Sequence, residues 1–438
     1  MFINYNHPAH KKRDRALIIH PELPSRPQSR DMEDILEEAE GLARAIELDV
    51  LQTETLKVSA IQASAFFGKG QREKVAGIVE ETDPDIVIVN GTLSPVQQRN
   101  LEKEWNRKVI DRTGLILDIF GARAQTKEGR LQVDLAALEY QRSRLVRSWT
   151  HLERQRGGAG FMGGPGERQI ELDRRIIDQK IVQLKKDLEQ VMRTRRLGRQ
   201  NRERVPYPVI ALVGYTNAGK STLFNTITDA GVFAEDLPFA TLDPTLRKIT
   251  LSNNQEAILS DTVGFISDLP THLVAAFRAT LEQTVYSDVI VHVIDVSRHD
   301  WQSQREDVIR ILQDLGIEYE RDNRIIEAYN KIDALPPEER ERLSHKFHGR
   351  DDVILISALK KKGLAELDES CIDILAARHV DVNFTLPYAD GRSLGWLYDH
   401  ADVLKREDCE EGIKLSFRID PGMLEKFKQE TGYKVKTS

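Results

Sequence analysis

The sequence has few cysteines, no long hydrophobic run and no excess of one charge, and each absence excludes a class of protein. Two cysteines, Cys371 and Cys409, are too few for a disulfide framework or a cysteine-rich zinc site. No stretch approaches the roughly 18 uncharged apolar residues of a membrane-spanning helix. The polar stretch Met1–Arg15 also lacks the apolar core of a secretory signal. These absences predict a cytoplasmic protein without a membrane span.

Neither sign of charge dominates the composition. The chain has 63 basic and 70 acidic side chains, a net charge of −7, and hydrophobic and charged shares of 40% and 30%. These values are ordinary for globular proteins and give no indication of a nucleic-acid partner. Since domains typically contain roughly 100–200 residues, the length predicts two to four domains.

Strands alternate with helices in two stretches of the chain. In residues 15–122, β-type runs such as Ile86–Val89 alternate with helical patterns such as the acidic one over Met32–Ile46. This alternation predicts a small α/β domain with a mainly parallel sheet. A second α/β domain is predicted for residues 207–379.

The last part of the chain, residues 380–438, has a weaker pattern. Two strands are predicted there, at Asn383–Leu386 and Gly412–Ile419, together with two helices at Ser393–His400 and Met423–Gln429. We therefore expect a small α+β domain at the carboxyl-terminal end.

Between the two α/β domains, apolar residues recur with the spacing of heptads. Steps of four and three residues run from Leu131 to Leu152 and again from Ile170 to Val191, interrupted by Arg142 in the first series and Arg174 in the second. A glycine-rich loop, Gly157–Glu167, separates the two series. Residues 123–200 are therefore predicted to form a long antiparallel helical hairpin with this loop at its tip.

The predicted hairpin is basic although the chain is acidic. Residues 121–204 contain 20 basic and 11 acidic side chains, a net charge of +9, so the remainder carries −16. Arginine, which suits phosphate contacts and stacking on bases, dominates this basic set. Phe161 and Met162 in the loop are suited to entering a crevice or contacting unstacked bases. The hairpin is thus expected to contact RNA, although charged flanks of paired helices are commonly just solvated.

A complete phosphate-binding loop begins the second α/β domain. The G-x-x-x-x-G-K-[ST] pattern follows the β-type run Val209–Val213 and precedes a helical pattern, as the motif requires. Backbone N–H groups and the helix N-terminus are expected to bind phosphates, Lys220 to reach the β- and γ-phosphates, and Ser221 to ligate Mg²⁺. The residues expected to contact nucleotide here are Gly214, Tyr215, Thr216, Asn217, Ala218, Gly219, Lys220, Ser221 and Thr222.

Two later motifs predict that the nucleotide is GTP or GDP. Asp333, in the sequence Asn330-Lys331-Ile332-Asp333, can accept hydrogen bonds from the N1–H and N2–H₂ edge of guanine, which adenine lacks. Asn330 can bond the N7/O6 side of the base, and the Lys331 stem can cover the ring. Ser357, Ala358 and Leu359 are expected to close the pocket with backbone N–H groups.

The segments expected to respond to the γ-phosphate lie between these motifs. In Asp261-Thr262-Val263-Gly264, Asp261 is expected to hold Mg²⁺ through water, and the Gly264 N–H to contact the γ-phosphate. Thr241 is the candidate for a second hydroxyl on Mg²⁺. It lies within Phe239, Ala240, Thr241, Leu242 and Asp243. Lys220, Thr241 and Gly264 are the predicted catalytic residues.

The residue after Gly264 is Phe265, where Ras-type GTPases place a glutamine that orients the attacking water. An apolar side chain cannot do this, so hydrolysis is expected to be slow until a partner rearranges the site, or to use another group. Asn217 in the phosphate loop suggests a bound monovalent cation, K⁺, as a supplementary positive charge near the β- and γ-phosphates.

Together these motifs resemble the Obg–HflX superfamily of translation-factor-related GTPases. Three further segments are similar to the HflX family specifically: the loop and helix Gly157–Arg175, Arg112–Phe120 and Gln132–Leu138. The resemblance covers residues 15–380. The expected α/β architecture is a small N-terminal α/β domain with its long helical hairpin, then a P-loop GTPase domain with a mostly parallel sheet, then the small α+β domain.

The resemblance implies a Mg²⁺-dependent GTPase that binds the large (50S) ribosomal subunit, is linked to stress, and splits or rescues stalled ribosomes. The hairpin, residues 123–204, would contact 23S rRNA and ribosomal proteins, with its tip toward the peptidyl transferase region. We expect a monomer. The alternatives are a ribosome-assembly GTPase and a non-ribosomal regulatory GTPase with a protein partner. An RNA-acting ATPase is disfavoured because the N-terminal domain has no phosphate loop.

Overall fold

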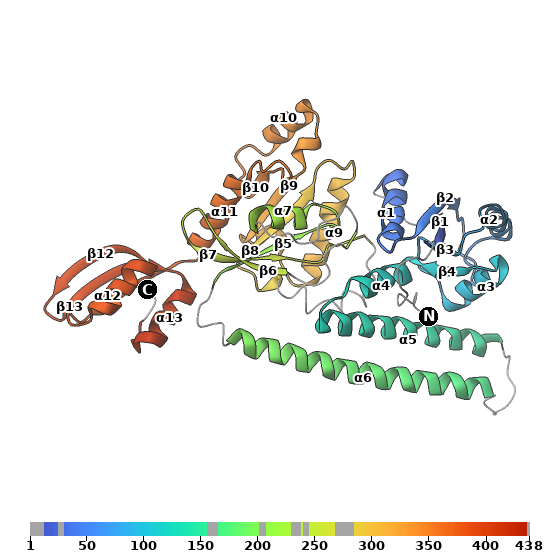
Figure 1. Ribbon diagram of the computed structural model, residues 1–438, viewed down its shortest axis with the longest axis horizontal. Helices are drawn as coiled ribbons and strands as arrows, with labels where there is room; N and C mark the ends of the chain where they lie inside the picture. The colour runs from blue at the N-terminus through green and yellow to red at the C-terminus, as the bar shows by residue number, and fades with distance from the viewer. Residues whose placement is uncertain are drawn as a thin grey trace.

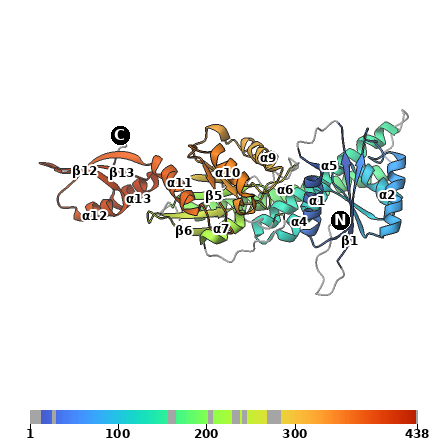
Figure 2. The same ribbon diagram turned by 90° about the horizontal axis from the view of Figure 1, so that it is seen from above.

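The computed structural model describes residues 13–24, 30–155, 165–200, 207–228, 238–239, 245–267 and 284–435. Three sheets follow one another along the chain in an elongated arrangement (Figure 1). The N-terminal sheet and the C-terminal sheet lie at opposite ends, with the six-stranded sheet between them, as the view from above also shows (Figure 2). The predicted fold class is confirmed.

The N-terminal sheet is parallel throughout, with the order β2-β1-β3-β4. The strands are β1 (Arg15–Glu22), β2 (Asp49–Lys57), β3 (Ile86–Val89) and β4 (Lys108–Asp111). The helices are α1 (Met32–Arg44), α2 (Lys69–Thr82), α3 (Pro95–Trp105) and α4 (Arg112–Arg123). Because both faces are covered by helices, alternate residues of β1 enter different cores: Ile18 packs in the cluster that contains Phe120, and Leu17 in the cluster that contains Leu101.

Two long helices form the predicted hairpin and lie side by side below the N-terminal domain in Figure 1. They are α5 (Lys127–Gln155) and α6 (Pro165–Gln200). α5 also packs on the N-terminal domain, where Val133 and Ala136 join the core beneath α4. The Tyr140 hydroxyl donates to the buried Asp111 carboxylate at 2.7 Å. The hairpin is therefore fixed to the N-terminal domain through one of its two helices. No helix within the described ranges is long and apolar enough to cross a membrane.

The central sheet has six strands in the order β10-β9-β8-β5-β7-β6, and only β6 runs antiparallel to its neighbour. The strands are β5 (Val209–Gly214), β6 (Thr245–Thr250), β7 (Glu256–Asp261), β8 (Val289–Asp295), β9 (Ile325–Asn330) and β10 (Val353–Leu355). The helices are α7 (Lys220–Thr228), α9 (Trp301–Asp314), α10 (Pro337–Lys346) and α11 (Leu364–Ala377). Parallel strands end at one edge of a sheet, which brings Gly214, Asp261 and Asn330 together there.

The C-terminal sheet is antiparallel, with the order β11-β13-β12. Its strands are β11 (Val380–Leu386), β12 (Asp402–Cys409) and β13 (Gly412–Ile419), and its helices are α12 (Gly391–His400) and α13 (Pro421–Thr431). The sequence predicts only two of these strands. β12 was missed because it is an edge strand with mostly exposed, charged side chains, and it lacks the apolar alternation by which strands are recognised.

Candidate nucleotide site

The phosphate loop turns sharply from β5 into α7. Gly214 has φ 151° and Gly219 has φ 92°, and a Cβ atom on either would lie about 2.2–2.3 Å from a neighbouring atom, the Val293 carbonyl oxygen or the Asn330 Nδ2. Asn217, with φ 63°, takes the left-handed conformation that asparagine tolerates better than most residues. The two glycines thus let the loop close against β8 and β9. Thr222 follows in the first turn of α7.

Lys220 lies at the floor of this loop. Its side chain is buried, and Nζ donates to the carbonyl oxygens of Gly214 at 3.0 Å and Tyr215 at 2.7 Å. Burial lowers the pKa of Lys220 to about 8, and the charge of Asp261 partly offsets this shift. An anion at the loop would favour the protonated lysine, so the site is electrostatically suited to phosphate.

Two oxygen ligands suited to Mg²⁺ lie together beside the loop. The Ser221 hydroxyl donates to Asp261 Oδ2 at 2.8 Å, and Asp261 is fully buried at the end of β7. Hydroxyl and carboxylate oxygens are the ligand types that Mg²⁺ prefers. The third predicted ligand, Thr241, lies outside the described residues together with Ala240, Leu242 and Asp243.

The segment after Asp261 is attached to the phosphate loop. The Phe265 N–H donates to Gly214 O at 3.1 Å, and the Thr216 N–H donates to Phe265 O at 2.7 Å. A Cβ atom on Gly264 would lie 2.9 Å from Thr216 Cα and 3.2 Å from Lys220 Nζ, so glycine is required at this close approach. The Thr262 side chain faces the neighbouring strand rather than the phosphate loop, because its hydroxyl donates to the Leu212 carbonyl oxygen of β5 at 2.6 Å. Val263 and Phe265 are buried in the adjoining core.

The predicted guanine-binding residues also lie together. Asn330 Nδ2 donates to Ala218 O at 2.9 Å, and its Oδ1 accepts from the Ala358 N–H at 3.0 Å. Asn330 thus ties the phosphate loop to the loop after β10. The Ser357 hydroxyl donates to Asp333 Oδ1, which orients that carboxylate.

The other residues predicted to bind guanine are neighbours of Asn330, Asp333 and Ser357 in the chain. The Lys331 ammonium lies 2.7 Å from Asp295 Oδ2, and the Lys331 backbone has φ 65°. The side chain of Ile332 is buried, whereas that of Leu359 is 70% exposed, so Leu359 can contribute backbone groups but little packing.

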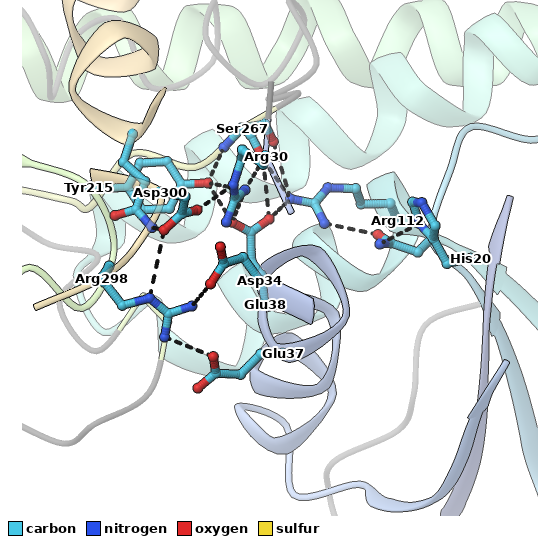
Figure 3. A network of polar contacts seen from close by, with 12 residues as sticks. His20, Arg30, Asp34, Glu37, Glu38, Arg112, Tyr215, Ser267, Arg298 and Asp300 are labelled. Carbon is cyan, nitrogen blue, oxygen red and sulfur yellow. Dashed lines mark hydrogen bonds and ion pairs between the residues drawn. The ribbon is translucent and has the colours of Figure 1, made fainter. Parts of the chain in front are cut away.

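Two predicted site residues direct their side chains toward the N-terminal domain. The ring of Phe239 packs edge to face on Phe120 of α4, with centroids 4.6 Å apart. The Tyr215 hydroxyl donates to Glu38 of α1. The close-up in Figure 3 shows the polar residues around Glu38, which come from both domains.

Sequence reasoning missed this set, whose members join the two domains. Beside Tyr215, they are Arg30, Glu38, Arg112, Ser267 and Asp300. Arg112 opens a segment with a recognisable family pattern, but neither a motif nor a spacing singles out Glu38 within the acidic helix α1.

Relatives match this chain over nearly its whole length. It is 47% identical over 416 residues to the GTPase HflX of Magnetococcus marinus, covering 95% of this chain and 94% of that protein. It is 41% identical over 406 residues to the GTPase HflX of Escherichia coli K12, covering 93% of each chain.

Family profiles match the first three parts of the chain. The profile described as "GTP-binding GTPase N-terminal" matches residues 33–121, the "GTP-binding GTPase Middle Region" matches residues 123–202, and the "50S ribosome-binding GTPase" matches residues 209–331. Among solved structures, a complex of SsGBP with GDP matches with a TM-score of 0.47 and 24% identity, over 82% of this chain and 98% of that one.

Proposed function

Because the chain belongs to the HflX family of GTPases and hydrolyses GTP, we propose that it is a switch that binds the large ribosomal subunit and splits or rescues stalled ribosomes. The observation that carries this proposal is a basic helical hairpin fixed to the domain that contacts the nucleotide loop. The matching family profile for residues 209–331, described as a 50S ribosome-binding GTPase, supports the choice of partner.

The arrangement of the described site residues supports the following roles. Lys220 would bind the β- and γ-phosphates, and the Gly264 N–H would contact the γ-phosphate. Mg²⁺, which GTPases of this kind require, would be held by Ser221 and, through water, by Asp261, and would neutralise the charge that develops on the phosphates. Asp333, oriented by Ser357, would select guanine.

The hairpin is the proposed RNA-binding surface. Six basic residues of α6 are exposed in the described part of the helix: Arg174, Arg175, Lys180, Lys185, Lys186 and Arg193. Exposed apolar side chains lie among them, with Leu172 and Val182 each 54% accessible. A helix with basic and apolar groups on its surface suits contacts with both rRNA phosphates and ribosomal proteins.

We expect deletion of residues 157–166, the predicted hairpin tip, to leave GTP binding unchanged and to abolish ribosome splitting. The nucleotide residues lie in another domain, whereas the tip would enter the ribosome. Splitting is measured by sedimentation of 70S particles incubated with GTP and the protein, and GTP binding by titration with a fluorescent GTP analogue. A variant with the tip replaced by an equally long glycine–serine loop controls for hairpin integrity.

Splitting that survives the deletion would contradict the proposed role of the tip. Intact 70S particles with the unmodified protein, together with binding to immature large subunits, would instead indicate the assembly role. Binding that depends weakly on salt would indicate a protein partner, since contacts to RNA phosphates weaken steeply as salt rises.

We further propose that K⁺ supports catalysis beside Asn217, whose backbone has φ 63° within the phosphate loop. A monovalent cation there would add positive charge that Phe265 cannot provide. We expect the GTPase rate to be about tenfold higher in K⁺ than in Na⁺ at matched ionic strength. Asn217→Ala should remove this difference, and equal rates of the unmodified protein in the two salts would exclude the cation.

A further inference from the structure

The carboxylate of Glu38, in α1 of the N-terminal domain, is enclosed by donors from both domains (Figure 3). Its side chain is only 8% exposed. Arg30 Nη1 lies 2.7 Å from Oε2, and Arg112 Nη2 pairs with Oε1. From the GTPase domain, the Tyr215 hydroxyl donates to Oε2 and the Ser267 hydroxyl to Oε1, the latter at 3.2 Å. All oxygens of this carboxylate therefore have partners.

The carboxylates of this cluster pair with guanidinium groups. Arg30 also pairs with Asp300 at 2.5 Å. A third guanidinium, Arg298, lies 3.8 Å from Asp300 and pairs with the nearby carboxylates of Asp34 and Glu37. Although burial alone would raise the pKa of Glu38, Arg112 and Arg30 hold it near 2. Glu38 is thus ionised at neutral pH, and the loss of one partner would leave a buried charge incompletely paired, which is costly.

The two residues that Glu38 binds in the GTPase domain belong to the phosphate loop and to the segment after Gly264. Tyr215 follows Gly214 in the phosphate loop, and Ser267 lies three residues after Gly264. The Ser267 N–H also donates to the Tyr215 hydroxyl at 2.8 Å. This contact and the two backbone hydrogen bonds of Phe265 hold residues 264–267 against the phosphate loop. Glu38 then holds Ser267, at the far end of this segment, through its hydroxyl.

We propose that Glu38 is a positioning residue of the GTPase reaction, which acts from the N-terminal domain through Tyr215 and Ser267 to fix Gly264 over Lys220. The inference rests on the proposed contact between the Gly264 N–H and the γ-phosphate. A donor contributes most to the transition state when its position is fixed before the reaction, and small displacements of catalytic groups reduce rates strongly. Both Glu38 oxygens are occupied by side chains of the two domains, so its effect is expected in the chemical step rather than in binding.

The test measures intrinsic GTP hydrolysis by the full chain, without ribosomes, for Glu38→Gln, Tyr215→Phe and the double variant. Each single variant is expected to lower kcat about tenfold, with KM for GTP within about twofold of the unmodified protein. Because both changes weaken the same Glu38–Tyr215–Ser267 network, the double variant should lose less than the two single losses combined. Glu37→Gln is the matched control. Glu37 is a neighbour on α1 whose carboxylate is 63% exposed and pairs with Arg298 at 2.9 Å, and its loss should change neither constant.

Tyr215→Phe keeps the buried ring and both arginine pairs of Glu38, so it tests the proposal even if Glu38→Gln fails to fold. An unchanged kcat for Tyr215→Phe, or losses that add fully in the double variant, would overturn the proposal. A rise in KM without a fall in kcat would also overturn it, because that result assigns the cluster to binding. Since ribosomes are absent from the assay, failure of the ribosomal role would leave this result unaffected.

Discussion

Replacement of Lys220 by alanine is expected to lower kcat for GTP hydrolysis about 100- to 1,000-fold while the protein remains folded. The ammonium is buried beneath the phosphate loop, and its two carbonyl contacts hold it where phosphate charge would develop. Alanine removes the charge. Among the described residues, no other cationic side chain lies in the phosphate loop to replace it. Phosphate release at saturating GTP and Mg²⁺ measures the effect.

Lys248→Ala is the control for this experiment. Lys248 belongs to the same domain, but it lies on the edge strand β6, where it is half-exposed and pairs with Glu256 at 2.6 Å. Its replacement should leave kcat unchanged. A Lys220→Ala protein that retained more than about a tenth of the activity would show that another group supplies the positive charge at the phosphates.

Replacement of Asp333 by asparagine is expected to reverse the base preference. The carboxylate would accept two hydrogen bonds from the N1–H and N2–H₂ groups of guanine, whereas an amide keeps one acceptor and places a donor where the second acceptor is needed. Sites that recognise a ligand by such bonds reject the wrong partner by about 10⁴-fold, so kcat/KM for GTP should fall by about that factor. Xanthosine triphosphate has an oxygen in place of the 2-amino group and should become the better substrate.

The comparison of kcat/KM for the two nucleotides measures this change. Asp351→Asn, an exposed carboxylate beyond the end of α10, is the control and should keep the preference for GTP. A variant of Asp333 that still preferred GTP would mean that guanine is selected elsewhere, for example by the backbone of residues 357–359.

The sequence predicted those parts of the protein whose determinants are local. Strands such as β3 and β5 are short, largely buried apolar runs, and the phosphate loop needs glycine and lysine at fixed spacing, so each can be recognised in a few consecutive residues. The strand order, by contrast, comes from the structure, and it is what places the ends of β5, β7 and β9 at one edge of the sheet.

The contacts between domains could not be predicted in this way. Glu38 and Tyr215 are 177 residues apart in the chain, and a glutamate in an acidic surface-type helix has no local feature that marks it as buried. Strand β12 could not be predicted for a related reason: its exposed, charged side chains are explained by its position at the edge of the sheet. Both features depend on tertiary packing, which the periodicity of the sequence does not encode.

Asp111 and Arg112 are consecutive residues with contacts in different directions. Asp111 binds Tyr140 of the hairpin, whereas Arg112 donates to the Ser267 carbonyl oxygen at 3.2 Å, next to the nucleotide loop. This dipeptide therefore connects α5 of the hairpin to the segment beside the phosphate loop. From Tyr140 to Gln155, the end of α5, the helix rises about 22 Å, so a rotation of about 10° at this contact would move that end about 4 Å. Because Asp111 and Arg112 are consecutive, the orientation of the hairpin is tied through a single peptide unit to the position of Ser267.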